Sequence, residues 1–145
     1  MQLTTRSRYG LRMLLDIALN SANGPVRIQD IATRRKISVK YLEQLIRELK
    51  KGGMIHSKRG PRGGHVLAKP STEIKIGDVV RILEGHPALT ECVNDESVCP
   101  ISSDCVARRI WERATQSVFR ELDSITLADM LAQVGQATGP AFPCC

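Results

Sequence analysis

A mostly α-helical fold with one small β-hairpin is predicted by three features of the amino-acid sequence. Apolar residues make up 42% of the 145 residues but aromatic residues only 3%, so an aliphatic core of packed helices is expected. Most of the chain repeats its apolar residues at helical spacing. One glycine cluster, at 60–64, separates two runs that suit short strands. The length is that of one domain with an appendage.

Three helical patterns open the chain. The first covers residues 7–20 and ends before an Asn-Gly-Pro sequence, and a second, shorter one covers 27–35. Lys36 then occupies the turn position where many helix-turn-helix units have glycine, and a left-handed lysine costs on the order of 1 kcal/mol. The third pattern follows Ser38, a good N-cap, and ends at the glycine pair 52–53. Two short helices joined by a tight turn are therefore expected.

A hairpin and a polar loop come next. Residues 54–58 and 65–69 each suit a strand, and the Gly-Pro-Arg-Gly-Gly turn between them gives the hairpin a basic tip. A short helix is predicted over 77–83. Residues 84–100 are polar and show no periodicity, so we expect a loop that is ordered only if something holds it.

A long helix dominates the C-terminal part. It is predicted from Ser102, as N-cap, to about Leu122, because apolar residues recur at every fourth position and form a stripe that needs a partner. A last short helix covers 125–131 with Thr126 as its cap, and residues 135–145 are expected to form a loose tail.

The charge is divided unevenly between the two halves. Residues 1–75 hold 16 Lys and Arg against 5 Asp and Glu, whereas residues 76–145 hold 5 against 10. The first half is therefore a candidate polyanion-binding surface, and the scarcity of aromatic residues argues against single-stranded nucleic acid. No apolar run approaches the roughly 18 residues of a membrane span and no signal-peptide core is evident, so a cytoplasmic protein without a membrane partner is expected.

Helix, turn, helix and basic hairpin, in this order, form a winged helix-turn-helix, whose second helix enters the major groove of double-stranded DNA. Glutamate and glutamine can read cytosine and adenine, lysine and arginine bind guanine or phosphate, and a wing arginine suits a narrow minor groove. The candidate DNA-binding residues are Ser38, Lys40, Tyr41, Glu43, Gln44 and Arg47 in the helix and Lys58, Arg59 and Arg62 in the wing. A protein-interaction module is the alternative.

Three of the five cysteines form a second candidate site. Cys92, Cys99 and Cys105 lie within 14 residues, and Cys105 is expected in the first turn of the long helix, where the helix dipole favours a negatively charged ligand. Three soft ligands suit an iron–sulphur cluster or zinc. Free thiols or an adventitious disulfide are the alternative.

Several motifs, taken together and in order, resemble the Rrf2 family of transcriptional regulators. They are Met-Gln-Leu-Thr-Thr-Arg-Ser-Arg-Tyr-Gly-Leu-Arg at 1–12, Ile-Ser-Val-Lys-Tyr-Leu-Glu-Gln-Leu-Ile at 37–46, Arg-Gly-Pro-Arg-Gly-Gly at 59–64, the three cysteines, and Ile-Thr-Leu-Ala-Asp-Met-Leu at 125–131. The resemblance covers roughly residues 1–132. It implies a homodimer formed through the long helix, an iron–sulphur cluster on the three cysteines near the dimer interface, and control by iron–sulphur status, oxygen or nitric oxide. It also implies that residues 41–44 read the major groove and Arg59 the minor groove.

A fourth cluster ligand is not supplied by the positions that relatives use. Some relatives have a histidine three residues after the last cysteine or an acidic residue near the N-terminus, whereas this chain has Arg108 and Arg8, whose guanidinium groups stay protonated. Cys144 and Cys145 are expected to be uninvolved, because a dithiol on a loose tail loses entropy on binding. A 2Fe-2S cluster is favoured over 4Fe-4S. The remaining candidates by proximity are His86, Glu91, Asp95, Glu96 and Asp104.

The sequence as a whole predicts a homodimeric, non-enzymatic transcription regulator that binds a palindromic operator. The expected organisation is a winged helix-turn-helix domain at 1–75, a short helix and cysteine-bearing loop at 76–100, a dimerisation helix and terminal short helix at 101–134, and a tail at 135–145. No small-molecule substrate is expected, because no catalytic constellation or phosphate loop is present. Two alternatives stay open: a cluster-free thiol or zinc sensor, and an adaptor that binds an enzyme of cysteine or cluster metabolism.

Overall fold

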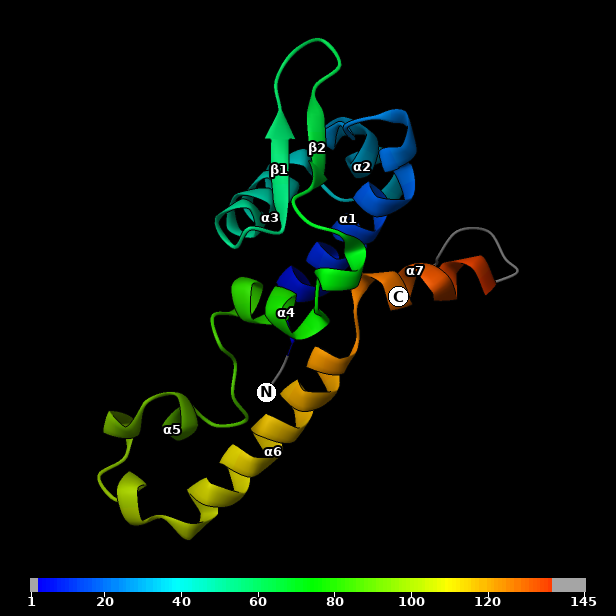
Figure 1. Cartoon of the computed structure of the whole chain (residues 1–145). Coiled ribbons are helices and arrows are strands. Elements are labelled where there is room, and N and C mark those ends of the chain that lie inside the picture. The colour runs from blue at the N-terminus through cyan, green and yellow to red at the C-terminus, as the bar shows by residue number, and fades with distance from the viewer. Residues whose placement is uncertain (1–2, 137–145) are drawn as a thin grey trace.

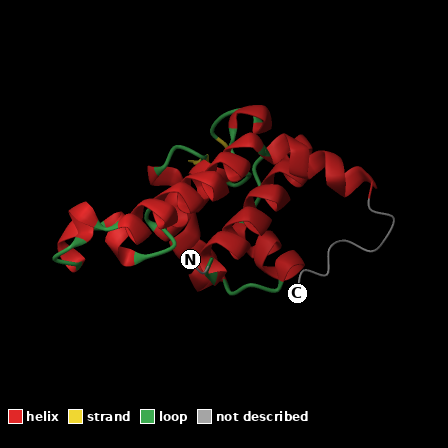
Figure 2. Cartoon of the chain, turned by 90° about the horizontal axis from the view of Figure 1, so that it is seen from below, coloured by secondary structure: helices red, strands yellow, loops and turns green. Residues whose placement is uncertain are grey.

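The computed structural model describes residues 3–136, in which a helical head sits at one end of a long helix (Figure 1). Helices make up most of the described residues, and the two strands found among these residues form the hairpin (Figure 2). The elements are α1 (Thr5–Asn20), α2 (Ile28–Arg35), α3 (Val39–Lys51), β1 (Ile55–Lys58), β2 (Gly64–Leu67), α4 (Ile76–Glu84), α5 (Glu91–Asn94), α6 (Val106–Ser124) and α7 (Leu127–Gln136). No helix among these residues is both long and apolar enough to cross a membrane.

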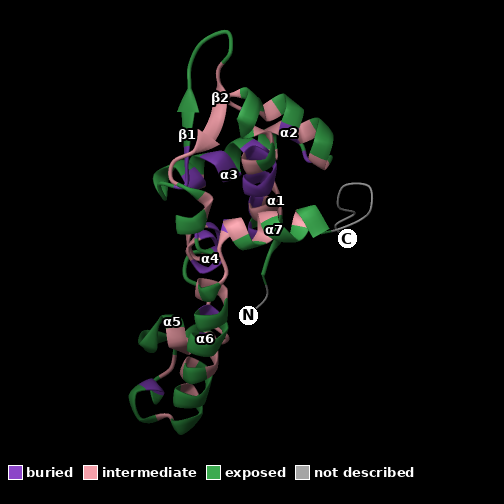
Figure 3. Ribbon diagram, turned by 45° about the vertical axis from the view of Figure 1, so that its right-hand side comes forward, coloured by how far each residue is buried: buried purple, intermediate pink, exposed green. Residues whose placement is uncertain are grey.

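The helix α1 runs through the centre of the head. Met13, Leu14 and Ile17 are fully buried on it. A Cβ atom at Gly10 would overlap the side chain of Leu83, so glycine permits the close contact between α1 and α4. The mostly aliphatic core expected from the composition is confirmed, and Figure 3 shows that its buried residues concentrate in α1, α3 and α4.

The carboxylate of Glu84, at the end of α4, fixes the beginning of α1. It accepts hydrogen bonds from the backbone N–H and hydroxyl of Thr4, at 3.0 and 2.9 Å, and from those of Ser7, at 3.2 and 2.6 Å. Burial disfavours the charged form of Glu84, but the hydrogen bonds from Ser7 and Thr4 outweigh it and hold the pKa below its usual value. The first turn of α1, which carries Arg6, is thereby held in place.

The helix-turn-helix is formed as expected. Lys36 ends α2 in the left-handed conformation, with φ 53° and ψ 46°, which confirms its place in the turn. Ser38 caps α3, because its hydroxyl accepts a hydrogen bond from the backbone N–H of Tyr41 at 3.2 Å. The apolar stripe of α3, which includes Leu42, Leu45 and Leu49, is buried against α1 and α2.

The hairpin is also confirmed, with strands slightly shorter than expected. Strand β1 pairs antiparallel with β2, from Ile55 opposite Leu67 to Lys58 opposite Gly64. Val26, from the segment before α2, pairs with His65 through two backbone hydrogen bonds of 2.9 and 2.8 Å. The wing is therefore tied to the helix-turn-helix at its base.

The helices α4 and α7 complete the head. Backbone hydrogen bonds join Ile76 to Ile125 at 2.9 Å and Leu127 to Ile74 at 2.8 Å, so the segment before α4 pairs with the link between α6 and α7. Thr126 caps α7 as expected, since its hydroxyl accepts a hydrogen bond from the Asp129 N–H at 3.2 Å.

Several expectations for the C-terminal part are wrong. Residues 84–100 are not a plain loop, because they include α5 and a 3-10 turn at Glu96–Val98. Ser102 does not cap the long helix; it begins a 3-10 turn, and the extended backbone of Cys105 separates this turn from α6, which starts at Val106. Cys105 therefore precedes the first turn of α6. Gly135 and Gln136 belong to α7, and the rest of the expected tail lies outside the described residues.

Candidate nucleic-acid interface and cysteine lobe

The exposed face of α3 carries the residues that the sequence predicted to read the major groove. The opposite face of α3 is buried in the core, and this packing fixes the position of the helix and of the side chains that it exposes. The structure brings them together on one surface, since they lie in α3 or, for Ser38, at its N-cap, and face the solvent. The exposed residues are Ser38, Lys40, Glu43, Gln44 and Arg47.

Tyr41 differs from these residues because it is half-buried between α3 and α1. Its hydroxyl lies 3.0 Å from the Thr5 hydroxyl, and its ring meets Tyr9 edge to face, with centroids 5.8 Å apart and planes at 86°. The Arg12 guanidinium lies over the Tyr9 ring, 5.4 Å from its centroid. Tyr41 therefore positions α3 against α1.

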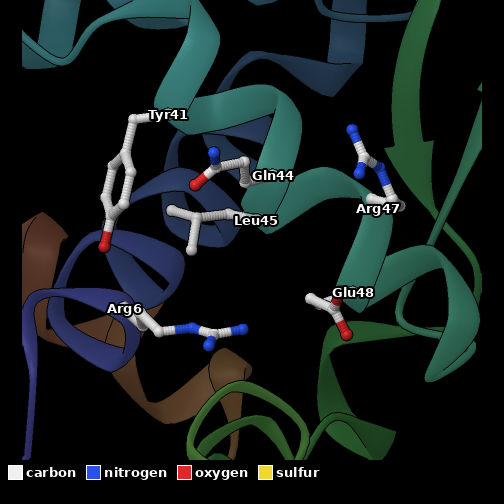
Figure 4. Close-up of a pocket in the computed structure, with 6 residues that line it drawn as sticks. All are labelled: Arg6, Tyr41, Gln44, Leu45, Arg47 and Glu48. Atoms are coloured by element: carbon white, nitrogen blue, oxygen red, sulfur yellow. The ribbon is translucent and has the colours of Figure 1, made fainter.

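A hollow of about 290 Å³ lies between the exposed face of α3 and the start of α1 (Figure 4). Arg6 extends toward this hollow from α1, opposite Gln44 and Arg47. Arg6 is exposed and was not among the DNA-binding residues predicted from the sequence. Its position in the basic half of the chain could have indicated a role in binding a polyanion. An arginine beside the side chains that the sequence predicts to read bases is suited to bind a phosphate.

The wing presents its basic residues at the tip of the hairpin. Lys58, Arg59 and Arg62 are all exposed. The sequence reasoning missed Arg27, whose guanidinium donates a hydrogen bond to the Pro61 carbonyl at 2.8 Å and so attaches the tip to the start of α2. No local signal could have revealed this contact, because 34 residues separate the two partners.

Gly64 and His65 fix the base of the wing. A Cβ atom at Gly64 would lie only 2.6 Å from the Val26 carbonyl oxygen, so a side chain there would break the pairing between these segments. The His65 ring nitrogen Nδ1 lies 3.1 Å from the Ser57 hydroxyl. Burial, and secondarily the charge of Lys50, lower the pKa of His65 below its ordinary value. The neutral form of His65 is therefore the one that suits the folded wing.

Two arginines of the basic half form ion pairs with a buried carboxylate. Asp16 is fully buried in α1, and its oxygens lie 2.6 Å from Arg34 Nη2 and 2.8 Å from Arg35 Nε. The hydrogen bond to Asp16 raises the pKa of Arg34 against the opposing effect of burial. This cluster fixes α2 against α1, so part of the positive charge counted in the sequence serves the fold.

The second site lies in the cysteine lobe, which we define as residues 90–105, between α4 and α6. Cys92 is in α5, Cys99 follows the first 3-10 turn of the lobe, and Cys105 directly precedes α6. All three are half-buried free thiols. Ser102 links two of them through the backbone, because its N–H donates to the Cys99 carbonyl at 3.1 Å and its carbonyl accepts from the Cys105 N–H at 3.4 Å.

The lobe carries the three thiols on one short segment of the chain without forming a ready-made ligand set. Within residues 3–136, no three histidine, cysteine, aspartate or glutamate side chains come close enough together to hold a metal ion. None of the acidic residues or His86 that were considered as a fourth ligand therefore completes such a group. Glu96 instead pairs with Arg108 at 2.8 Å, and Asp95 binds the N–H and hydroxyl of Ser97. Cys144 and Cys145 lie outside the described residues.

The head and the long helix meet at an arginine–aspartate pair. Arg81 of α4 binds both carboxylate oxygens of Asp123 of α6, at 2.7 and 2.8 Å, and its guanidinium lies 4.4 Å from the Phe119 ring centroid. This hydrogen bonding raises the pKa of Arg81 and lowers that of Asp123. A Cβ atom at Gly77 would overlap Asp123, so glycine is needed for the contact.

Known proteins resemble the chain over nearly its whole length. A family model described as Rrf2, iron-dependent transcriptional regulator, matches residues 3–133. The rrf2 protein of Nitratidesulfovibrio vulgaris is 50% identical over 131 residues, which are 90% of this chain and 87% of that protein. The structure of T. potens IscR has a TM-score of 0.77 at 36% identity and covers 98% of this chain and 94% of its own. The structure of CymR, the global cysteine regulator of B. subtilis, has a TM-score of 0.74 at 33% identity and covers 92% of this chain and 98% of its own.

Proposed function

The chain belongs to the Rrf2 family of transcriptional regulators, and from this premise we propose that it is a homodimeric regulator whose operator affinity is controlled by an iron–sulphur cluster on Cys92, Cys99 and Cys105. The family consists of DNA-binding transcriptional regulators, which confirms the expectation of a non-enzymatic protein. The observation that carries the proposal is the presence, in one chain, of an exposed polar face on α3 and three half-buried free thiols in the segment that leads into α6.

DNA binding follows from the arrangement of α3 and the wing. Gln44 and Glu43 project from α3 at positions suited to base edges, and Arg47 and Arg6 flank them as phosphate ligands. Arg59 at the wing tip is suited to the minor groove. A dimer presents two such units, and a palindromic operator matches this symmetry.

Dimerisation is supported by the apolar residues along α6. Ile110 is 56% exposed and Val118 37%, with Ala114 half-buried between them at helical spacing. The neighbouring Val106 and Trp111 are exposed as well. An uncovered stripe of this kind is costly in water, and a second copy of α6 is its natural cover.

The residues of the cysteine lobe fit a thiolate-bound group. Three free thiols supply the soft ligands that iron–sulphur clusters require. The hydroxyl of Ser102 is buried and has no hydrogen-bond partner in the described structure, although Ser102 is bonded through its backbone to Cys99 and Cys105. Such a hydroxyl is available to donate to a sulphur of the bound group. A cluster held there would supply a centre that responds to oxygen, nitric oxide or iron supply.

A cluster-free sensor that acts through the same thiols is the second candidate. The absence of a ready-made ligand set among residues 3–136 favours it, as does the similarity to CymR. Visible spectra of anaerobically purified protein separate the two candidates, because iron–sulphur charge-transfer bands are missing from thiol and zinc forms.

Cysteine variants test the ligand assignment. Cys92→Ser, Cys99→Ser and Cys105→Ser should each abolish the visible bands and most of the iron and sulphide after anaerobic reconstitution. The matched control is the double variant Cys144→Ser with Cys145→Ser, which should keep both. Stoichiometric iron in the Cys99→Ser protein would contradict the three-cysteine site.

A further inference from the structure

Arg108 reaches from the first turn of α6 back into the cysteine lobe. Its Nε donates a hydrogen bond to the Cys92 carbonyl at 2.8 Å, and its Nη2 lies 2.8 Å from Glu96 Oε1. Only 13% of the Arg108 side chain is exposed, whereas 64% of the Glu96 side chain is. One guanidinium therefore ties α6 to two points of the lobe, one of them 16 residues away in the sequence.

Both points lie on the segment from Cys92 to Cys99, one at its start and the other within it. Cys92 is in α5, and Glu96 begins the 3-10 turn that Cys99 follows. With Arg108 engaged, the Cys92 thiol faces the Thr90 hydroxyl at 3.3 Å. In this arrangement the three thiols do not converge as a ligand set, within the part of the chain that the structure describes.

We infer that Arg108 is a latch that keeps the cysteine lobe in a metal-free arrangement, and that its release from Cys92 and Glu96 allows the three thiols to converge on a metal. This inference rests on the proposed function, because it concerns the regulation of the same site. A ligand that binds only the released form has its affinity lowered by the fraction of chains in which the latch is closed.

The chemistry of the latch suits this role. A guanidinium keeps its charge at any physiological pH, so the latch opens only when its bonds are exchanged for others. The ion pair with Glu96 is the weaker of the two contacts of Arg108, because the exposed carboxylate is readily solvated. The hydrogen bond to the Cys92 carbonyl is the stronger of the two contacts, because it is partly buried. Metal–thiolate bonds are strong enough to replace both.

A purely supporting role for Arg108 would have the opposite consequence. If Arg108 held the thiols ready for metal, its removal would weaken metal binding. If Arg108 is a latch, its removal strengthens metal binding and exposes the Cys92 thiol. The sign of the change therefore separates the two roles.

The test uses the reduced, metal-free, full-length protein and the variant Arg108→Met, which keeps an apolar stem but removes the donors. Alkylation of Cys92, assigned by fragmentation mass spectrometry, should become about tenfold faster, the effect of losing roughly one charged hydrogen bond. Binding of Co²⁺, the metal alone, followed by its thiolate absorption bands, should tighten by a similar factor. Glu96→Gln should shift both in the same direction by less. The matched control is Arg109→Met, an exposed neighbour, which should behave as the parent protein.

Each outcome decides the inference. Unchanged alkylation of Cys92 in a folded Arg108→Met protein would overturn the latch, as would weaker binding of Co²⁺. If Arg108→Met does not fold, Glu96→Gln decides by the same two measurements, and no increase in either overturns the latch. Failure of the parent protein to acquire iron and sulphide would contradict the proposed cluster, whereas the alkylation and Co²⁺ results would still decide the latch.

Discussion

Asp16 is the one charged residue that is fully buried among residues 3–136. Its charge is balanced by Arg34 and by Arg35, of which only 10% is exposed. Removing one member of a buried ion pair leaves the other charge without compensation, which costs more than the pair itself contributes. The orientation of α2, and through it the turn before α3, therefore depends on this one carboxylate.

Asp16→Ala should lower the free energy of unfolding by about 3–5 kcal/mol, because it leaves Arg35 without its partner. Urea denaturation followed by circular dichroism measures the change. The control is Asp30→Ala, an exposed position in α2, which should change stability by less than about 0.5 kcal/mol. Equal destabilisation by the two variants would show that the buried cluster does not support the head.

The two wing arginines should differ in what they contribute to DNA binding. Arg59→Ala should cost about 1–3 kcal/mol of binding free energy and change the sequence preference, because a minor-groove contact depends on local groove width. Arg62→Ala should weaken binding to all sequences evenly, as expected for a phosphate contact. Electrophoretic shifts on a panel of operators at fixed salt measure both effects, and unchanged affinity in both variants would remove the wing from the interface.

At the scale of elements, the wing should be sensitive to mild acid through His65. The pKa of His65 in the folded protein lies below the ordinary value of 6.5, so the folded state binds this proton less readily than the unfolded state. Its stabilising contribution is therefore complete above pH 6.5 and is lost as the pH falls through the folded pKa. In urea denaturation across this range, His65→Gln should reduce the pH dependence, whereas His56→Gln, at an exposed position of β1, should leave it unchanged. An unaltered slope in His65→Gln would contradict this account.

The long helix α6 should be a dimer seam. Ile110→Glu places a charge in the exposed apolar stripe and should give monomers, or protein that does not fold without its partner. Arg109→Glu also adds negative charge one residue away and should leave the dimer intact. Analytical ultracentrifugation measures the result. A stable folded dimer of the Ile110→Glu protein would count against the seam.

The sequence predicted those elements whose signals are local. The caps at Ser38 and Thr126 and the left-handed Lys36 were foreseeable because each depends on a few neighbouring residues. The start of α6 was misplaced because Ser102 is a good N-cap residue shortly before the apolar stripe, which begins at Val106, and neither signal reveals the extended backbone at Cys105.

The candidate site was foreseeable to a similar extent. The exposed polar face of α3 and the clustering of the three cysteines along one short segment of the chain could be read from periodicity and spacing. The contribution of Arg6 to the hollow, the attachment of the wing by Arg27 and the bonds of Arg108 to the lobe could not. Each of these depends on how segments distant in the sequence meet in space.

At the scale of the whole molecule, the proposed DNA-binding surface of α3 and the wing lies near one end and the cysteine lobe near the other, and α6 connects the lobe to the head (Figure 1). The lobe leads directly into α6 at Cys105, and the other end of α6 is held to the head by Asp123 and Arg81. The backbone bonds of Ile125 and Leu127 to the segment before α4 reinforce this junction. A change in the lobe that shifts α6 would therefore be transmitted to the spacing of the two recognition helices in a dimer.

Control of DNA affinity by cluster occupancy can be measured on a single preparation of the protein. Operator binding is measured anaerobically by fluorescence anisotropy, at one salt concentration, on the same preparation before and after reconstitution, with iron and sulphide counted in each sample. If the cluster controls the affinity, the two values should differ by about 5- to 150-fold, the usual range of allosteric coupling, and Cys99→Ser should keep the cluster-free value throughout. Equal operator affinities for the loaded and the cluster-free protein would contradict control by the cluster.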